Sequence, residues 1–255
     1  LSLAKLRLNY AQVGNLDGFD LLYDVYLTNS PINGANTQLA AIKRNPNLKN
    51  ERTNSIEGGL EMSFLNARVG FDLALYQTNS KDQIIPVTVS QTTGFQSLML
   101  NTGEIQNKGI EFTVSATPVR TGSFSWDMTL NWAKNKSMVN TLYGDLESYV
   151  ISGGFGGCKT LGIPGEEWGV LWGLPFVKNE AGKTVVDERG IPKTTSVGEK
   201  LGTVTPDWTG GLNNSLRYKN AYLSFLIDAR FGGDIFSTTA WHSYPTGSYE
   251  VTVKD

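Results

Sequence analysis

The stretch "AYLSFLIDARFGG", residues 221–233, carries apolar side chains at every second position. These alternating residues are Leu223, Phe225, Ile227, Ala229 and Phe231. An acid and a base, Asp228 and Arg230, lie between them. Because successive side chains of a strand point to opposite sides, the alternation predicts a β-strand. One face of this strand is therefore expected to meet an apolar environment and the other to meet water.

Six earlier segments repeat this period of two. They span residues 3–13, 55–64, 68–76, 109–117, 124–133 and 209–218. The charged residues of the seven segments all fall on the polar face: Lys5, Arg7, Glu57, Glu61, Arg68, Asp72, Glu111, Asp127, Arg217, Asp228 and Arg230. In the sixth segment, Asn214 interrupts the apolar row.

Contact with lipid explains this partition, since a charge near the bilayer midplane costs about 2–4 kcal/mol. A soluble β-sandwich also excludes charge from its inner face, so the partition alone leaves both folds open. Strand length favours the membrane. Several alternations run for the ~9–11 residues that a tilted membrane strand needs, whereas soluble strands cluster near about five or six.

The spacing of the segments also favours a barrel. Short connections alternate with long links: the short ones are 65–66, 118–123 and 219–220, and the long ones are 14–50, 77–107 and 135–207. Tight turns at one end and large loops at the other are typical of a transmembrane β-barrel. Three such long links would be unusual in a compact soluble domain.

Aromatic side chains lie near both ends of the segments, as two girdles at the lipid–water boundaries would. Those beside the short connections are Phe64, Phe124 and Tyr218, and those at the opposite ends are Tyr10, Trp132 and Phe231. We expect five residues to face lipid: Leu73, Val114, Leu130, Phe225 and Ile227. We expect six to face a water-filled lumen: Glu57, Asp72, Glu111, Asp127, Asp228 and Arg230.

The composition of the 255-residue chain agrees with this interpretation. The formal net charge of −2 gives no general attraction to nucleic acid. No apolar run reaches the 18 or more residues of a membrane-spanning helix. The mean hydropathy of −0.22 is compatible with a barrel, because only one face of each barrel strand is apolar.

Several motifs, in order along nearly the whole chain, resemble the barrel of SusC/RagA-like TonB-dependent outer-membrane transporters. The most specific are "NPNLK" (45–49), "NTGE" (101–104) with "NKG" (107–109), and "PDWTGG" (206–211). The resemblance implies an all-β, antiparallel barrel of about 22 strands with a plugged lumen. About seven strands cannot close such a barrel, so residues 1–255 are expected to be one arc of it, with a long extracellular excursion at 135–207. The signal peptide, the TonB-contacting segment, the plug and the closing strands are expected to lie outside this chain.

The resemblance also implies a function: nutrient import across the outer membrane of a Gram-negative bacterium. A SusD-like surface lipoprotein would act as a lid, TonB would rearrange the plug, and an oligosaccharide or a peptide would enter the periplasm. No catalytic residue, cofactor or metal is expected. The family often carries an Asp-rich loop before the Pro-Asp-Trp motif, and residues 185–202 depart from that pattern.

Few residues point to site chemistry. His242 is the only histidine and Cys158 the only cysteine, so histidine triads and multi-histidine metal sites cannot be built from this chain alone. The stretch "GEEWGVLWGLPF" (165–176) sets Trp168 and Trp172 among glycines and acids. These indoles could stack on sugar rings or receive peptide side chains. They could equally be a hydrophobic anchor that folds the long loop onto itself or onto a neighbouring protein.

Three classes of function remain at this point. The first is part of a membrane transporter, and the second is a soluble or surface-attached β-sandwich that binds glycans or acts as an adhesin. A requirement for detergent would distinguish these two. The third is a barrel enzyme at the outer membrane, which needs convergent catalytic groups at the barrel mouth. A single histidine argues against most versions of it.

Overall fold

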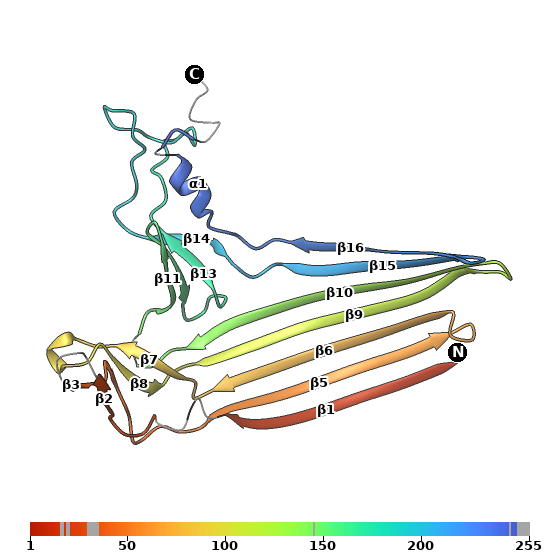
Figure 1. The fold of residues 1–255 in the computed structure, drawn as a ribbon, viewed down its shortest axis with the longest axis horizontal. Coiled ribbons are helices and arrows are strands. Elements are labelled where there is room, and N and C mark those ends of the chain that lie inside the picture. The colour runs from red at the N-terminus through yellow and green to blue at the C-terminus, as the bar shows by residue number, and fades with distance from the viewer. Residues whose placement is uncertain (16–17, 19–20, 30–35, 145, 245, 249–255) are drawn as a thin grey trace.

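The computed structural model describes residues 1–15, 18, 21–29, 36–144, 146–244 and 246–248. Its largest element is a seven-stranded antiparallel sheet in the order β1-β5-β6-β9-β10-β15-β16 (Figure 1). The strands are β1 Leu3–Asn15, β5 Glu51–Phe64, β6 Val69–Lys81, β9 Glu104–Arg120, β10 Phe124–Thr141, β15 Trp208–Tyr218 and β16 Ala221–Phe231. Each predicted segment coincides with one of these strands, so the predicted strand order along the chain is confirmed.

Four strands continue past the predicted segments toward the end of the sheet that carries the long links. We call this the long-loop end and the opposite one the short-turn end. Here β5 begins at Glu51, β6 ends at Lys81, β9 begins at Glu104 and β10 ends at Thr141. Both faces of these extensions carry polar residues, so the ladder of hydrogen bonds persists where the alternation of side chains fades. Ile105 and Val139, two apolar residues of these extensions, are buried, so side chains here do not divide into an apolar face and a polar face.

The strand register places the apolar rows of all seven strands on one face. One row crosses the sheet through the pairs Leu6↔Leu60, Leu60↔Leu73, Leu73↔Phe112 and Phe112↔Trp132. Since neighbouring residues alternate between faces, the five residues expected to face lipid share this apolar face. The six residues expected to face the lumen share the opposite, polar face.

The apolar face of the sheet is uncovered in the described part of the chain (Figure 1). Ile227 is 56% exposed and Phe225 is 44% exposed. Buried hydrophobic residues such as Met99, Val139 and Val170 lie instead at the long-loop end. A β-sandwich would cover its apolar face with a second sheet, so the sandwich alternative is wrong for this sheet.

Strand β9 reaches Arg120 and therefore includes Pro118, which the sequence placed in a connection. The register shifts here, because Trp126 pairs with Val119 whereas Met128 pairs with Ala116. The extra residue on β9 forms a β-bulge. A proline lacks the N–H that a regular ladder needs, and a bulge is one of the few places in a sheet that accept it.

Three smaller sheets lie at the long-loop end (Figure 1). The first pairs β2 (Tyr26–Asn29) with β3 (Asn36–Leu39), and the second joins β4 (Ile42–Lys43), β8 (Ser97–Asn101) and β7 (Ile84–Thr88). The third, which we call the loop sheet, joins β11 (Tyr149–Phe155), β12 (Cys158–Gly162), β13 (Val170–Gly173) and β14 (Glu199–Thr203).

Two short helices complete the described elements: the 3-10 helix η1 (Gln91–Thr93) and the α-helix α1 (Thr238–Ser243), which follows β16. Neither is long or apolar enough to cross a membrane, and the same holds for every helix of the described residues. A small core of Leu21, Ile84 and Met99 packs beside the second sheet.

Candidate functional site

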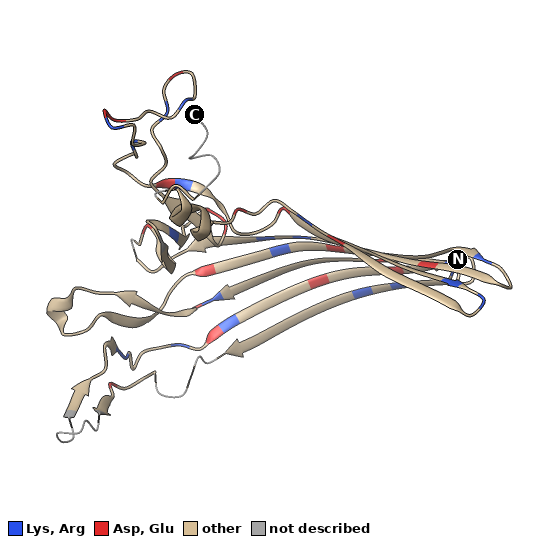
Figure 2. Cartoon of the chain, turned by 45° about the horizontal axis from the view of Figure 1, so that its top comes forward, with Lys and Arg blue, Asp and Glu red and all other residues tan. Residues whose placement is uncertain are grey.

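A cluster of ion pairs lies on the polar face. The Arg7 guanidinium donates from Nη1 to Glu61 Oε2 at 3.1 Å and from Nη2 to Asp72 Oδ1 at 2.5 Å. Lys5 Nζ lies 3.7 Å from the same Glu61 oxygen. Arg7 therefore ties together the three strands β1, β5 and β6. Figure 2 shows acidic and basic residues distributed along the strands of the sheet.

The other charged residues of the polar face make separate contacts. Asp127 accepts a hydrogen bond from Thr117 Oγ1 at 2.6 Å, and Arg230 Nη2 donates to the Val204 carbonyl at 3.2 Å. Glu57 lies opposite Tyr76 across β5 and β6. The six predicted lumen residues are therefore spread over the sheet and form no single site.

Glu111 and Asp228 border one groove of about 410 Å³ on the sheet. Thr113 and Asn131 also line it, and the Thr113 hydroxyl donates to Asn131 Oδ1 at 3.0 Å. The groove thus presents polar groups on the polar face of the sheet. Water or a mobile polar group would solvate it well.

The polar interruption of the apolar face has a structural explanation. Asn214 is only 5% exposed, and its Oδ1 accepts a hydrogen bond from the Trp126 indole Nε1 at 3.1 Å. A buried amide costs little when it has a partner. An apolar surface can therefore contain Asn214 without an unsatisfied acceptor.

Residues 165–168 attach the loop sheet to the extension of β10. The backbone N–H groups of Val139 and Trp168 donate to the carbonyls of Glu166 and Ser137, at 3.0 and 2.8 Å. Lys200 Nζ pairs with Glu166 Oε2 at 2.6 Å. The two adjacent acids of the "GEEW" motif thus lie where the loop sheet meets the extension of β10. The second acid, Glu167, has its Oε1 3.7 Å from Lys136 Nζ.

Trp168 and Trp172 are both half-buried but occupy different environments. The Trp168 ring stacks on Tyr149, with ring centroids 6.4 Å apart and an interplanar angle of 20°. Both rings line a cavity of about 430 Å³, which also receives Gln83 and Asn107. Trp172 lies in β13 against Gly198 and is not among the residues of that cavity. The two indoles therefore do not form one platform.

Sequence reasoning missed Tyr149 and the amides around it. They come from β6, β9, β11 and the segments beside them, so no single stretch carries their signal. Tyr149 opens the stretch "YVISGGF", a run of mostly apolar residues and glycines that is too weak a pattern to mark a site. Only the folded chain brings these residues together.

Neither the single cysteine nor the acids suggest metal chemistry. Cys158 is buried in β12, and burial raises the pKa of its thiol, which keeps it protonated near neutrality. Within the residues that the structure describes, no group of three histidine, cysteine or acidic side chains could hold a metal ion.

Comparison with known proteins gives relatives over nearly the whole chain. TonB-dependent receptor P26 of Formosa agariphila is 31% identical over 94% of this chain, which corresponds to 27% of that protein. TonB-dependent receptor SusC of Bacteroides thetaiotaomicron is 29% identical over 92% of this chain and 26% of its own length. The chain thus spans about a quarter of the length of these curated relatives.

Solved structures share the fold. The RagAB peptide importer in its "closed-closed" state superposes on 90% of this chain with a TM-score of 0.72 at 20% identity, covering 27% of that chain. The family described as "TonB dependent receptor-like, beta-barrel" matches residues 2–252. The open antiparallel sheet, with one apolar and one polar face, is what part of such a barrel wall requires. The chain therefore belongs to the TonB-dependent receptor-like β-barrel family.

Proposed function

We propose that this chain forms one arc of the barrel wall, with its outer loops, of a transporter that imports nutrients across the outer membrane of a Gram-negative bacterium. The apolar face of the sheet contacts lipid through Leu73, Val114, Leu130, Phe225 and Ile227. The polar face lines the lumen and holds the plug. The long-loop end faces the cell exterior.

One observation carries this proposal: a seven-stranded sheet whose apolar face is uncovered and whose opposite face bears the ion pairs. The Arg7, Glu61 and Asp72 charges need water or one another, while Leu73 and Phe112 on the other side need an apolar environment. A wall between hydrocarbon and a wet lumen meets both needs at once.

The resemblance to SusC/RagA-like transporters supports a cargo of oligosaccharide or peptide, and the structurally similar RagAB is a peptide importer. We propose that a SusD-like surface lipoprotein covers the long-loop end and that TonB supplies the energy through a segment outside this chain. Trp168 is proposed to border the path of the cargo, because its ring lines a cavity at this end. Trp172 is proposed to contact cargo or the lipoprotein.

Uptake by the native host tests the proposal. Cells that lack the gene, and cells that lack the adjacent lipoprotein gene, are given fluorescent oligosaccharides and peptides. We expect both deletions to abolish uptake of the same cargo, and a protonophore to abolish it in wild-type cells. Uptake of a porin-sized sugar should be unchanged. Normal uptake of every large cargo in the gene-deleted cells would refute a role in import.

A further inference from the structure

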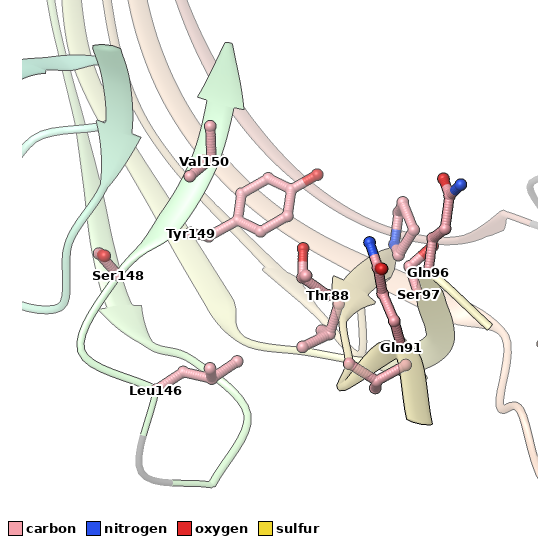
Figure 3. A pocket seen from close by; sticks show the side chains of 11 residues that line it. Thr88, Gln91, Gln96, Ser97, Leu146, Ser148, Tyr149 and Val150 are labelled. Atoms are coloured by element: carbon pink, nitrogen blue, oxygen red, sulfur yellow. The ribbon is translucent and has the colours of Figure 1, made fainter. Parts of the chain in front are cut away.

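Tyr149 lies between two cavities at the long-loop end. On one side, with Trp168, it lines the cavity of about 430 Å³ described above. On the other side it borders a cavity of about 710 Å³ between the β7–β8 hairpin and the start of β11 (Figure 3). Both volumes fall within the ~300–1,000 Å³ typical of ligand pockets. The two cavities meet at the Tyr149 side chain. We call the two cavities together the Tyr149 trough.

The described residues that line the Tyr149 trough carry hardly any charge. Among the residues that the structure describes, the larger cavity is lined by proline, valine, leucine, threonine, serine, glutamine and tyrosine. The smaller one contains a single charged residue, Glu51. Its two oxygens already accept hydrogen bonds, from the Ile84 backbone N–H at 2.8 Å and from Asn15 Nδ2 at 3.1 Å. Both oxygens of the Glu51 carboxylate are thus already hydrogen-bonded within the protein.

Apart from Glu51, the polar groups of the trough that the structure describes are neutral, and several of them have no partner among the described residues. The side-chain amides of Gln83, Gln91 and Gln96 and the hydroxyl of Thr88 make no hydrogen bond to any other described residue. Figure 3 shows the Gln91 amide, the Thr88 hydroxyl and the Tyr149 ring around the same space. Each amide offers two donors and an acceptor. Such groups match a ligand that presents many hydroxyls.

The trough also offers apolar surface beside these amides. Pro86, Val87 and Val89 line the larger cavity, and the stacked rings of Tyr149 and Trp168 line the smaller one. A pyranose ring has an apolar C–H face and a rim of hydroxyls, so it uses both kinds of surface. A sulfate, a uronate or a peptide terminus would lose hydration here without gaining an ionic partner.

We propose that the Tyr149 trough binds an uncharged oligosaccharide as it enters the transporter. This inference rests on the proposed import function and narrows its cargo to neutral glycans, taken in preference to acidic glycans and peptides. Trp168 would then act as part of the trough wall. Gln91, Gln96 and Tyr149 would supply its hydrogen bonds.

Binding to the purified full-length protein tests the proposal. The probes are an array of neutral oligosaccharides, an array of uronate-containing and sulfated oligosaccharides, and a library of short peptides. The test variants are the double substitution Gln91→Ala with Gln96→Ala, and Tyr149→Phe, which removes only a hydroxyl. Gln38→Ala is the control, because it removes an exposed amide of β3 outside the trough.

We expect at least one neutral oligosaccharide to bind and both test variants to bind it more weakly. The double variant should lose about tenfold or more in affinity, since it removes two hydrogen-bonding side chains. The control should bind like the wild type. Binding that is indifferent to both variants, binding only of acidic glycans or peptides, or no binding of any neutral oligosaccharide would overturn the proposal. If the same full-length protein still assembles and supports energised uptake, the import function would stand and only the neutral-glycan site would fall.

Discussion

Arg7 on β1 reaches Asp72 on β6 across the intervening strand β5, where its partner position is Gly59. A Cβ atom at Gly59 would lie 2.9 Å from Arg7 Nε, so a side chain there would push the guanidinium away from its position over the strand. The adjacent glycine, Gly58, faces the other way, and a Cβ there would meet Leu8 Cδ2 at an ordinary 3.7 Å. Two neighbouring glycines thus have different structural roles.

Substitution of these glycines should therefore have unequal effects. We expect Gly59→Ala to displace Arg7 from Asp72 and to lower the Tm of the full-length barrel in detergent. Gly58→Ala is the matched control and should leave the Tm close to that of the wild type. Asp72→Asn combined with Gly59→Ala should add little to Gly59→Ala alone, because both remove the same contact. Equal Tm values for the two alanine variants would contradict this role of Gly59.

The turn between β5 and β6 should gain stability from a glycine. Leu65, Asn66 and Ala67 all have positive φ angles, of 52°, 54° and 64°. A residue with a Cβ pays roughly 1–2 kcal/mol in this region, whereas glycine does not. We expect Ala67→Gly to raise the free energy of unfolding by about 1 kcal/mol, measured by denaturant titration in detergent.

Ala74→Gly is the control for that turn. Ala74 lies inside β6, so glycine there should lower the free energy of unfolding by about 0.5–1 kcal/mol. If Ala67→Gly lowers the free energy of unfolding as much as Ala74→Gly does, the positive φ at Ala67 does not strain the turn in the detergent-solubilised protein.

The thiol of Cys158 should react slowly and only at raised pH. Burial raises its pKa, so the thiolate fraction at pH 7 is smaller than that of an exposed cysteine. We expect the rate of maleimide labelling in the native protein to increase as pH rises toward and past the ordinary thiol pKa of about 8.5. Labelling at pH 7 as fast as in the denatured protein would contradict burial of this side chain.

Because Cys158 is expected to react slowly with maleimide, cysteines introduced elsewhere can be labelled with little background. Such labelling tests which end of the sheet faces the cell exterior. Lys183 lies in the segment between β13 and β14, at the long-loop end, and Asn220 lies in the turn between β15 and β16. With a membrane-impermeant maleimide on intact cells, Lys183→Cys should be labelled and Asn220→Cys should be protected until the cells are broken. The opposite result would invert the orientation of the chain in the membrane.

Much of the fold could be predicted from the sequence because its main strands face two different media. Alternation of apolar and charged residues located all seven strands, and the single outlier, Asn214, is satisfied by Trp126. Pro118 was placed in a connection because the alternating segment was taken to end at residue 117, and only the register reveals the bulge that accepts the proline in β9. The strand extensions were missed because polar residues on both of their faces break the alternation, although Ile105 and Val139 within them are buried.

The candidate site was far less predictable. Trp168 stood out as an aromatic residue among glycines, but its partner Tyr149 lies 19 positions earlier and is brought to it by the pairing of β11 with β12 and β12 with β13. The reach of Arg7 to Asp72 likewise depends on register and on the absence of a side chain at Gly59. Contacts of this kind follow from the pairing of strands, which the period of one strand does not reveal.

The assignment of the two faces is tested most directly by a matched set of arginine substitutions in the full-length protein. Leu73→Arg and Phe225→Arg place a charge on the apolar face, and Thr113→Arg and Ser224→Arg place one on the polar face. The fraction folded in the outer membrane is measured by heat-modifiable electrophoretic mobility. We expect the first pair to lose most folded protein, since each charge in hydrocarbon costs about 2–4 kcal/mol, and the second pair to retain it. Equal folded fractions for the two pairs would contradict a sheet that separates lipid from a lumen.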